Sequence, residues 1–248
     1  MTDRALYIAM TGASTSLKTQ ASVSHNLANA NTVGFQATLA GSTATPVKGD
    51  GHASRVAAAA QTYGVSGTHG AILETGNTLD VALNQDRWLT VQDAQGNPAY
   101  TRAGNLAMNA NGLLTSNGRP VLGTDGAPVT VPPFQSMDIA SDGTISIVPQ
   151  GQPANTIAEA GRLGVVQART TDLVRGDDGL MRQAAGQPAP PPAAGESLTP
   201  GAVENSNVEA TSMLVQMIQT ARAFEMQVRV LQSVDENARS ANSLLGSR

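Results

Sequence analysis

The chain has no cysteine, few aromatic residues and few charged residues. The lack of cysteine excludes disulfide bonds, thiolate nucleophiles and cysteine-ligated metals, although it assigns no cellular compartment. Aromatic residues make up 3% and charged residues 14% of the 248 residues, whereas charged residues usually make up about a quarter of a soluble domain. So few large side chains disfavour one thick core and favour thin sheets, or elements that bury their surface against other chains.

Long apolar runs and a strong net charge are also missing. No run of about 18 apolar residues occurs, so no segment is predicted to span a bilayer. The apolar run at residues 5–10 is too short for a secretory signal peptide, and we expect no cleaved signal. The net charge of −4 gives no electrostatic reason to expect nucleic acid or an anionic membrane as a partner.

No sequence motif of an enzyme is present. The chain contains neither the GxSxG elbow of serine hydrolases nor a phosphate-binding glycine-rich loop nor an HExxH zinc motif. The histidines His25, His52 and His69 share no ligand spacing, so incidental or solvated roles are expected for them. We therefore predict that the chain is not an enzyme, and that it has no catalytic, cofactor-binding or metal site.

Acidic residues near predicted turns have an ordinary structural explanation. Asp80, Asp86 and Asp93 lie around one predicted hairpin, where carboxylates usually cap turns or face solvent. The run Asp177-Asp178-Gly179 lacks the further acidic ligands of a calcium-binding loop. A turn is the preferred interpretation there as well.

Apolar residues recur at alternating four- and three-residue steps near the C-terminus, which is the seam of a coiled-coil-like helix. The stripe consists of Ala210, Leu214, Met217, Ala221, Phe224, Val228 and Leu231. No proline or glycine falls between Val203 and Leu245, so we predict a helix over residues 205–248, capped by Asn205 or Asn207. Such a helix is roughly 60 Å long, too long to be buried in one small core, and it needs a partner.

The other end of the chain offers that partner. We predict a helix from Arg4 to Leu27 with Asp3 as its N-cap. Its seam consists of Leu6, Met10, Ala13, Leu17, Gln20, Ser24 and Leu27. The C-terminal stripe is longer than this helix, so apolar surface remains for neighbouring subunits. The residues predicted to pack are Leu6, Met10, Leu17, Leu27, Leu214, Met217, Phe224, Val228 and Leu231.

Between the two helices the sequence predicts a β domain. Residues 36–70 read as an extended connector with one short strand near Arg55–Tyr63, and residues 71–185 as short antiparallel strands. Turn dipeptides separate these strands: Gln95-Gly96, Asn111-Gly112, Asn117-Gly118, Asp125-Gly126 and Asp142-Gly143. Residues 186–204 form a proline-rich linker. The predicted class is α+β, in which residues 1–35 and 205–248 form a coiled-coil-like domain with the β domain inserted.

Four stretches in this order resemble the rod and hook proteins of the bacterial flagellum. The first is Asn26–Phe35, NLANANTVGF, with Asn26, Leu27, Asn29, Gly34 and Phe35 as its signature residues. The others are Gly76–Val91, the YTRAGN run at Tyr100–Asn105, and Glu204–Val208. The start MTDRALYIAMTGAS and the run RGDDGLMR at Arg175–Arg182 are most similar to the proximal rod proteins of that family.

The resemblance implies a structural subunit of the flagellar basal body. Such a subunit is exported by the flagellar type III apparatus and assembles with itself and other rod proteins into a helical tube across the periplasm. The tube transmits torque for motility, with the terminal helices on its inner side. A distal rod or hook-type axial subunit is the alternative. A more distant one is a secreted β-domain carbohydrate binder with a helical oligomerisation stalk, for which Trp88 and Tyr100 are the candidate stacking residues.

Overall fold

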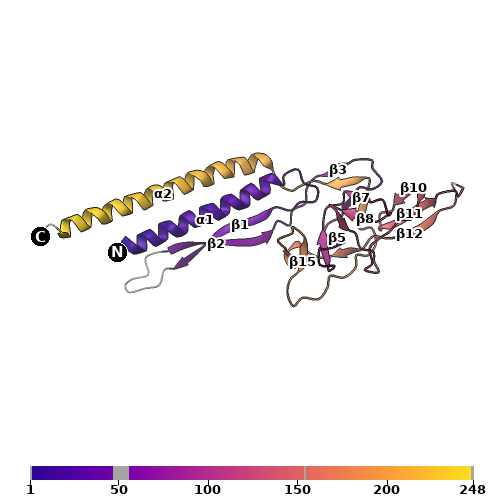
Figure 1. Ribbon diagram of the computed structural model, residues 1–248, viewed down its shortest axis with the longest axis horizontal. Helices are drawn as coiled ribbons and strands as arrows, with labels where there is room; N and C mark the ends of the chain where they lie inside the picture. Colours follow the sequence, from indigo (N-terminus) through magenta and orange to yellow (C-terminus); the bar gives the residue numbers. More distant parts are fainter. Residues whose placement is uncertain (1, 47–55, 154, 247–248) are drawn as a thin grey trace. The chain divides into compact units, whose positions relative to one another are not determined.

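Helices and antiparallel strands make up the computed structural model, which describes residues 2–46, 56–153 and 155–246 (Figure 1). This confirms the predicted α+β class. The chain divides into two compact units. Unit 1 comprises residues 1–28, 38–64 and 209–248, and unit 2 comprises residues 29–37 and 65–208. None of the described helices is long and apolar enough to cross a membrane.

Unit 1 is built from helix α1 (Thr2–Ala28), helix α2 (Ala210–Gly246) and a two-stranded ribbon. The ribbon pairs β1 (Thr38–Pro46) with β2 (Val56–Val65). Helix α1 packs against α2 on one side and against β1 on the other, so it is the middle layer of this unit (Figure 1).

The buried face of α1 is not the one that its large apolar residues predict. Leu6, Met10 and Leu17, expected to face the C-terminal helix, are 38%, 56% and 51% exposed. The buried positions are instead Ala9, Ala13 and Val23, and a Cβ added at Gly12 would lie 3.0 Å from the Gln227 side chain. Helix α1 has neighbours on two sides, and small residues allow both to approach closely.

The segment 36–70 is more ordered than the predicted extended connector. Residues 38–46 and 56–65 are paired strands, and the expected short strand at Arg55–Tyr63 corresponds to part of β2, with Arg55 outside the described residues. Small Ala, Ser, Thr and Gly side chains dominate both strands. They pack against α1 without the alternation of large apolar residues that marks a strand in a sequence.

Unit 2 is a stack of small antiparallel sheets. Its largest sheet has the order β13-β5-β6-β15-β14, and three-stranded sheets are formed by β10-β11-β12 and β7-β8-β9. Two further pairs are β16-β4 and β17-β3. The strands are β3 Ile72–Glu74, β4 Val81–Leu83, β5 Arg87–Gln92, β6 Pro98–Thr101, β7 Leu106–Met108, β8 Leu114–Ser116, β9 Arg119–Pro120, β10 Phe134–Ile139, β11 Thr144–Pro149, β12 Ala158–Arg162, β13 Val165–Gln167, β14 Leu173–Arg175, β15 Met181–Gln183, β16 Leu198–Pro200 and β17 Ala202–Glu204, with a 3₁₀ turn at Thr170–Asp172.

Aliphatic side chains from these strands form one core. It includes Leu83, Leu89, Leu114, Ile145 and Leu198, each no more than 2% exposed. The glycines of all five turn dipeptides have positive φ, which confirms the turns predicted from the sequence. In the two-residue turn between β8 and β9, Asn117 and Gly118 both have positive φ, as a type I′ hairpin requires.

The end of the predicted linker belongs to unit 2. Residues 198–204 form β16 and β17 rather than a spacer, and α2 begins at Ala210 rather than near residue 205. The predicted caps Asn205 and Asn207 therefore lie outside the helix. At the N-terminus, α1 already includes Asp3, the predicted N-cap of that helix.

Candidate assembly surface and junction clamp

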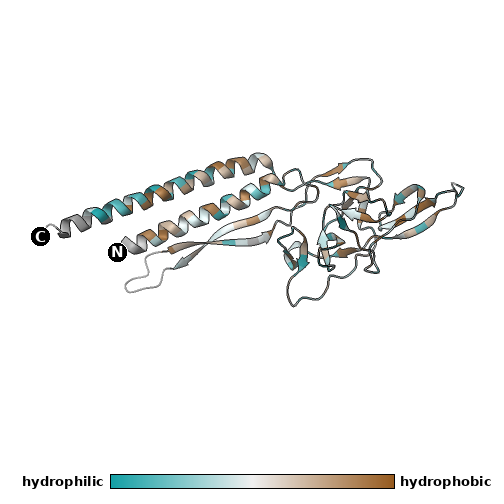
Figure 2. Cartoon of the chain, in the orientation of Figure 1, coloured by the Kyte–Doolittle hydropathy of each residue, from teal (hydrophilic) through white to brown (hydrophobic). Residues whose placement is uncertain are grey.

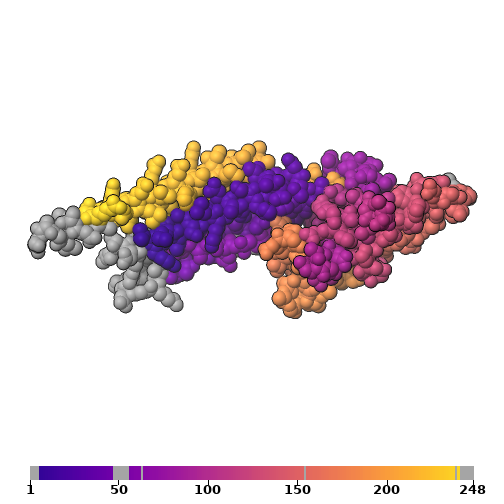
Figure 3. Space-filling view, in the orientation of Figure 1, coloured from indigo at the N-terminus to yellow at the C-terminus, as the bar shows by residue number. Residues whose placement is uncertain are grey.

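Large apolar side chains lie exposed along one side of each helix of unit 1. The nine residues of this exposed helical face are Leu6, Tyr7, Met10, Leu17, Leu214, Val215, Ile218, Met226 and Val230, which are 38–61% exposed. At about 100° per residue, the members on each helix fall within one half of its circumference. Figure 2 shows apolar residues interspersed with polar ones along both helices, and Figure 3 shows α1 and α2 side by side at the surface of the unit.

The residues predicted to pack divide between two environments. Leu27, Met217, Phe224, Val228 and Leu231 are half-buried in unit 1. Leu6, Met10, Leu17 and Leu214 belong to the exposed helical face.

Sequence reasoning missed Tyr7, Val215, Ile218, Met226 and Val230, because it searched for one stripe per helix. For the four α2 residues the sequence did contain a signal, because α2 carries apolar residues on two sides and α1 covers only one of them.

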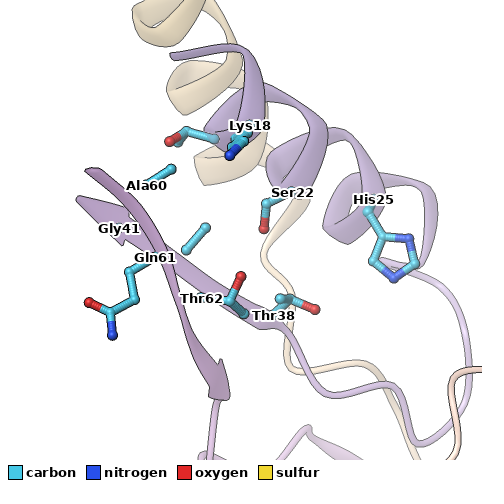
Figure 4. Close-up of a pocket in the computed structure, with 10 residues that line it drawn as sticks. Lys18, Ser22, His25, Thr38, Gly41, Ala60, Gln61 and Thr62 are labelled. Carbon is cyan, nitrogen blue, oxygen red and sulfur yellow. The ribbon is translucent and has the colours of Figure 1, made fainter. Parts of the chain in front are cut away.

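A hollow of about 310 Å³ lies between α1 and the β1–β2 ribbon (Figure 4). Its lining includes Lys18, Ser22 and His25 of α1 and Gln61 and Thr62 of β2. None of its ten lining residues is acidic. Among the described residues, no group of His, Asp and Glu is arranged to hold a metal ion.

The signature residues connect α1 to its continuation. The buried Asn26 side chain pairs with the backbone of Thr38, donating to its carbonyl at 3.0 Å and accepting from its amide at 2.9 Å. The carbonyl of Asn29 accepts a 3.1 Å bond from the Thr32 amide, which turns the chain after the helix. The Arg175 guanidinium lies 4.8 Å from the centre of the Phe35 ring, which fixes that side chain on unit 2.

Gly34 occupies a position that no other residue fits. Its φ is +68°, and a Cβ built there would lie 2.3 Å from the carbonyl carbon of Arg102 and 2.4 Å from the Ala103 nitrogen. The close approach lets the Gly34 amide donate a 2.7 Å hydrogen bond to the carbonyl of Glu204. The glycine therefore places the signature segment directly on the backbone of the YTRAGN run and beside β17.

A buried ion pair lies beneath that contact. The Arg102 and Glu204 side chains are 2% and 1% exposed, and Arg102 Nε donates to Glu204 Oε2 at 2.6 Å. The remaining guanidinium nitrogens donate to the carbonyls of Leu83 at 2.8 Å and Arg87 at 2.7 Å. The Trp88 ring lies 5.6 Å from the guanidinium carbon. Arg102 thus satisfies several buried acceptors at once, which only its planar, five-donor group can do.

The other oxygen of Glu204 binds two segments that precede the β sheets of unit 2 in sequence. Glu204 Oε1 accepts hydrogen bonds from Gln36 Nε2 at 3.3 Å and from the Gly70 amide at 3.0 Å. His69 Nδ1 lies 3.5 Å away, with the His69 side chain about one third exposed. His69 is therefore part of the surroundings of Glu204 rather than an isolated solvated residue, and His52 lies outside the described residues.

Asn207 binds the same segments from the other side. Its Oδ1 accepts a 2.7 Å hydrogen bond from the Ala37 amide, and its Nδ2 donates to the Thr68 carbonyl at 2.8 Å and to Gln36 Oε1 at 3.2 Å. This explains why Asn207 does not cap α2. We call Arg102, Glu204 and Asn207 the junction clamp, because they hold the segments that enter and leave unit 2.

Asp93 and Asp178, two of the acidic residues singled out in the sequence, lie at turns. Asp93 Oδ1 accepts from the amides of Gln95 and Asn97. Gly179 closes a turn with φ of +81° beside Asp178. The Arg182 guanidinium bonds both Asp178 and Asp93, at 2.7 Å and 3.0 Å, and links the two turns.

This pair of turns predicts a loss of stability in acid. The hydrogen bond from Arg182 lowers the pKa of Asp178 from 3.8 to about 2, and it also lowers the pKa of Asp93. A carboxylate with a depressed pKa stabilises the fold above its unfolded pKa, and that contribution is lost as the pH falls through the folded pKa. We therefore expect the urea midpoint to fall between about pH 4 and pH 2, and less steeply in Asp178→Asn than in the wild type.

Asp177→Asn is the matched control, since Asp177 forms no ion pair within the described ranges. It should leave the acid slope unchanged. An equal slope for wild type and Asp178→Asn would contradict the assignment to this pair.

Three family models match the chain. They are the flagella basal body rod protein model at residues 6–36, the flagellar hook protein FlgE/F/G D1 domain at residues 82–147, and the flagellar basal body rod FlgEFG protein C-terminal model at residues 199–244. Gly34, Arg102 and Glu204 fall in the first, second and third match respectively. The clamp therefore joins all three matched segments within unit 2.

Curated relatives cover nearly the whole chain. The flagellar basal-body rod protein FlgF of Escherichia coli (strain K12) is 45% identical over 248 residues, with 98% of each chain covered. FlgF of Mesorhizobium japonicum is 31% identical with the same coverage, and FlgG of Bacillus subtilis is 28% identical over 86% of this chain and 88% of its own. On this similarity and on the three matched segments, the chain belongs to the FlgF family of flagellar basal-body rod proteins.

Proposed function

We propose that this structural subunit of the flagellar basal-body rod assembles through the exposed helical face of unit 1. Neighbouring copies and other rod proteins cover that face in the assembled rod. The proposal extends to a proximal position in the rod, to coiled-coil-like packing of the terminal helices, to export by the flagellar type III apparatus without a cleaved signal, and to the transmission of torque across the periplasm.

The exposure of the helical face supports this proposal best. Nine large apolar side chains lie at the surface of a unit whose own core consists mostly of small residues. Complete burial of such a side chain contributes about 1.5–3 kcal/mol, so covering an exposed half contributes about 0.7–1.5 kcal/mol. Several of them together are enough to drive association of subunits, and the thioether of Met226 adapts to partners of different shape.

The test replaces apolar side chains without touching the packing between α1 and α2. Val215, Ile218 and Met226 are 54%, 54% and 61% exposed, so changing all three to glutamine leaves the folded monomer stable to within about 0.5 kcal/mol per site. We expect the triple variant to lose co-assembly with the other rod proteins in sedimentation assays and to abolish swimming when it replaces the wild-type chain.

A matched control changes equally exposed apolar residues of unit 2. Ile72, Ile157 and Val174 are 57%, 73% and 57% exposed. Their triple glutamine variant should assemble as the wild type does. The proposal fails if both variants assemble normally, or if both lose assembly to the same degree.

Both candidate sugar-stacking residues of the carbohydrate-binding alternative are buried. Trp88 and Tyr100 are only 2% and 7% exposed, and the indole nitrogen of Trp88 donates to the carbonyl of Ala168 at 2.9 Å. Neither ring can stack on a sugar. A distal rod or hook-type position remains the second candidate, and the 28% identity to a FlgG protein is the observation in its favour.

A further inference from the structure

We infer that residues 197–208, here named the closing segment, are required for unit 2 to fold although they are its last residues in sequence. The rest of unit 2 precedes them. Until they dock, its core is open and the Arg102 guanidinium has no counter-charge. The inference concerns the order of folding, and it does not depend on the proposed assembly surface.

The closing segment supplies part of the core of unit 2. Leu198 is 1% exposed within the main core, and Ala202 and Val203 are 0% and 5% exposed. In β4, every residue is buried, and β16 of the closing segment is its one strand partner among the described sheets. Without the segment, β4 would lose that partner and the core would lie open to water along this side.

Backbone hydrogen bonds join the segment to both ends of β4 and to the turn at Ser141. The Asn84 amide donates to the Ser197 carbonyl at 3.1 Å, and the Gly201 amide donates to the Asp80 carbonyl at 2.8 Å. The Ser197 amide donates to the Ser141 carbonyl at 2.9 Å. These groups are buried or half-buried, so leaving them without partners and away from water is costly.

The buried ion pair between Arg102 and Glu204 is a further reason why unit 2 needs the closing segment. Within the described parts of the chain, Glu204 is the carboxylate that pairs with Arg102, and both side chains are almost completely buried. A chain that lacks Glu204 has to bury the Arg102 guanidinium without a counter-charge or keep the site open. Breaking a buried pair by removing one partner is strongly destabilising because the remaining charge stays buried.

The two ends of unit 2 meet at the same residue. Gly34 and Gln36 precede the β sheets in sequence, and they bind the carbonyl and the carboxylate of Glu204. The signature segment therefore lacks these two hydrogen bonds until β17 is in place. A chain that emerges with its N-terminus first keeps unit 2 open until its residues up to about 208 are free.

A nicked form of the full chain tests the inference directly. A protease site inserted after Gly186 falls in exposed sequence, where a Cβ at that glycine would meet nothing within 4 Å. Trp88 is the single tryptophan and lies against Arg102, so its emission reports closure of this site. We expect the nicked protein to keep native emission while the two pieces remain bound.

Separation of the pieces is the decisive step. The piece ending at residue 186 should show unfolded emission and unprotected amides in β4 and β5, and adding back the piece that carries residues 187–248 should restore both signals. If the first piece alone keeps native emission and protected amides, the inference is wrong.

A variant of the intact chain gives an independent readout. Glu204→Gln should raise the unfolding equilibrium constant in urea by roughly 150-fold to 5,000-fold, as expected when one partner of a buried pair is removed. Glu196→Gln, which changes an exposed glutamate immediately before the closing segment, should change it less than about 3-fold. Equal effects of the two variants would overturn the role given to Glu204.

Discussion

Gly34→Ala is expected to destabilise unit 2 by about 2–5 kcal/mol or to expel the signature segment from it. The new methyl group would lie 2.3–2.4 Å from backbone atoms of Arg102 and Ala103, which cannot move aside as a flexible side chain would. Positive φ adds about 1–2 kcal/mol for any residue with a Cβ, and forced overpacking adds about 1–3 kcal/mol. Urea unfolding followed by Trp88 fluorescence measures the loss.

Two other glycines separate the clash from the backbone strain. Gly118 and Gly126 have φ of +77° and +78°, and a Cβ at either position meets nothing within 4 Å. Alanine at these sites therefore carries the conformational cost alone. The excess of Gly34→Ala over these variants measures the close approach to Arg102. No excess would mean that the signature segment does not rest on the YTRAGN run as described.

The turns of unit 2 could be predicted because their cause is local. A dipeptide such as Asn117-Gly118 tolerates positive φ at both positions, and this property is written in two adjacent residues. Apolar residues alternate at Leu79, Val81 and Leu83, and Trp88–Val91 follows as the next apolar stretch, which places β4 and β5 within the predicted β domain. Local chemistry thus predicted most of the hairpins and the α+β class.

The buried face of α1 could not be predicted in this way. The sequence pattern treats large residues as the interior, whereas Ala9 and Ala13 are buried and Leu17 is half exposed. Helix α1 lies between another helix and a ribbon of small residues. Its contact positions hold small side chains, which let both neighbours approach closely, rather than large side chains that fill a core. The β1–β2 ribbon could not be predicted either, because its sequence shows no alternation of large apolar residues.

The junction clamp could not be predicted from the sequence either, but for a different reason. Arg102 and Glu204 are 102 positions apart, and no spacing rule relates them. The motif resemblance identified the stretches that contain Gly34, Arg102 and Glu204 as three separate signatures. The structure gives them one physical cause, since the glycine rests on the arginine's backbone and bonds the glutamate's carbonyl.

Arg102→Lys is expected to cost about 2–5 kcal/mol although it keeps the positive charge. A lysine ammonium is a compact charge, so it cannot reach Glu204 and the carbonyls of Leu83 and Arg87 together. Each buried acceptor left without a donor costs about 1–3 kcal/mol. The loss is measured as the change in the free energy of unfolding in urea.

Arg169→Lys provides the matched comparison. Arg169 makes two hydrogen bonds to Asp172, but its side chain is 73% exposed and water replaces a lost bond there. We expect this variant to stay within about 0.5 kcal/mol of the wild type. If Arg102→Lys is equally mild, charge alone holds the clamp and the fork of the guanidinium is dispensable. A large difference means that the geometry of Arg102, rather than its charge, joins β4, β5 and β17.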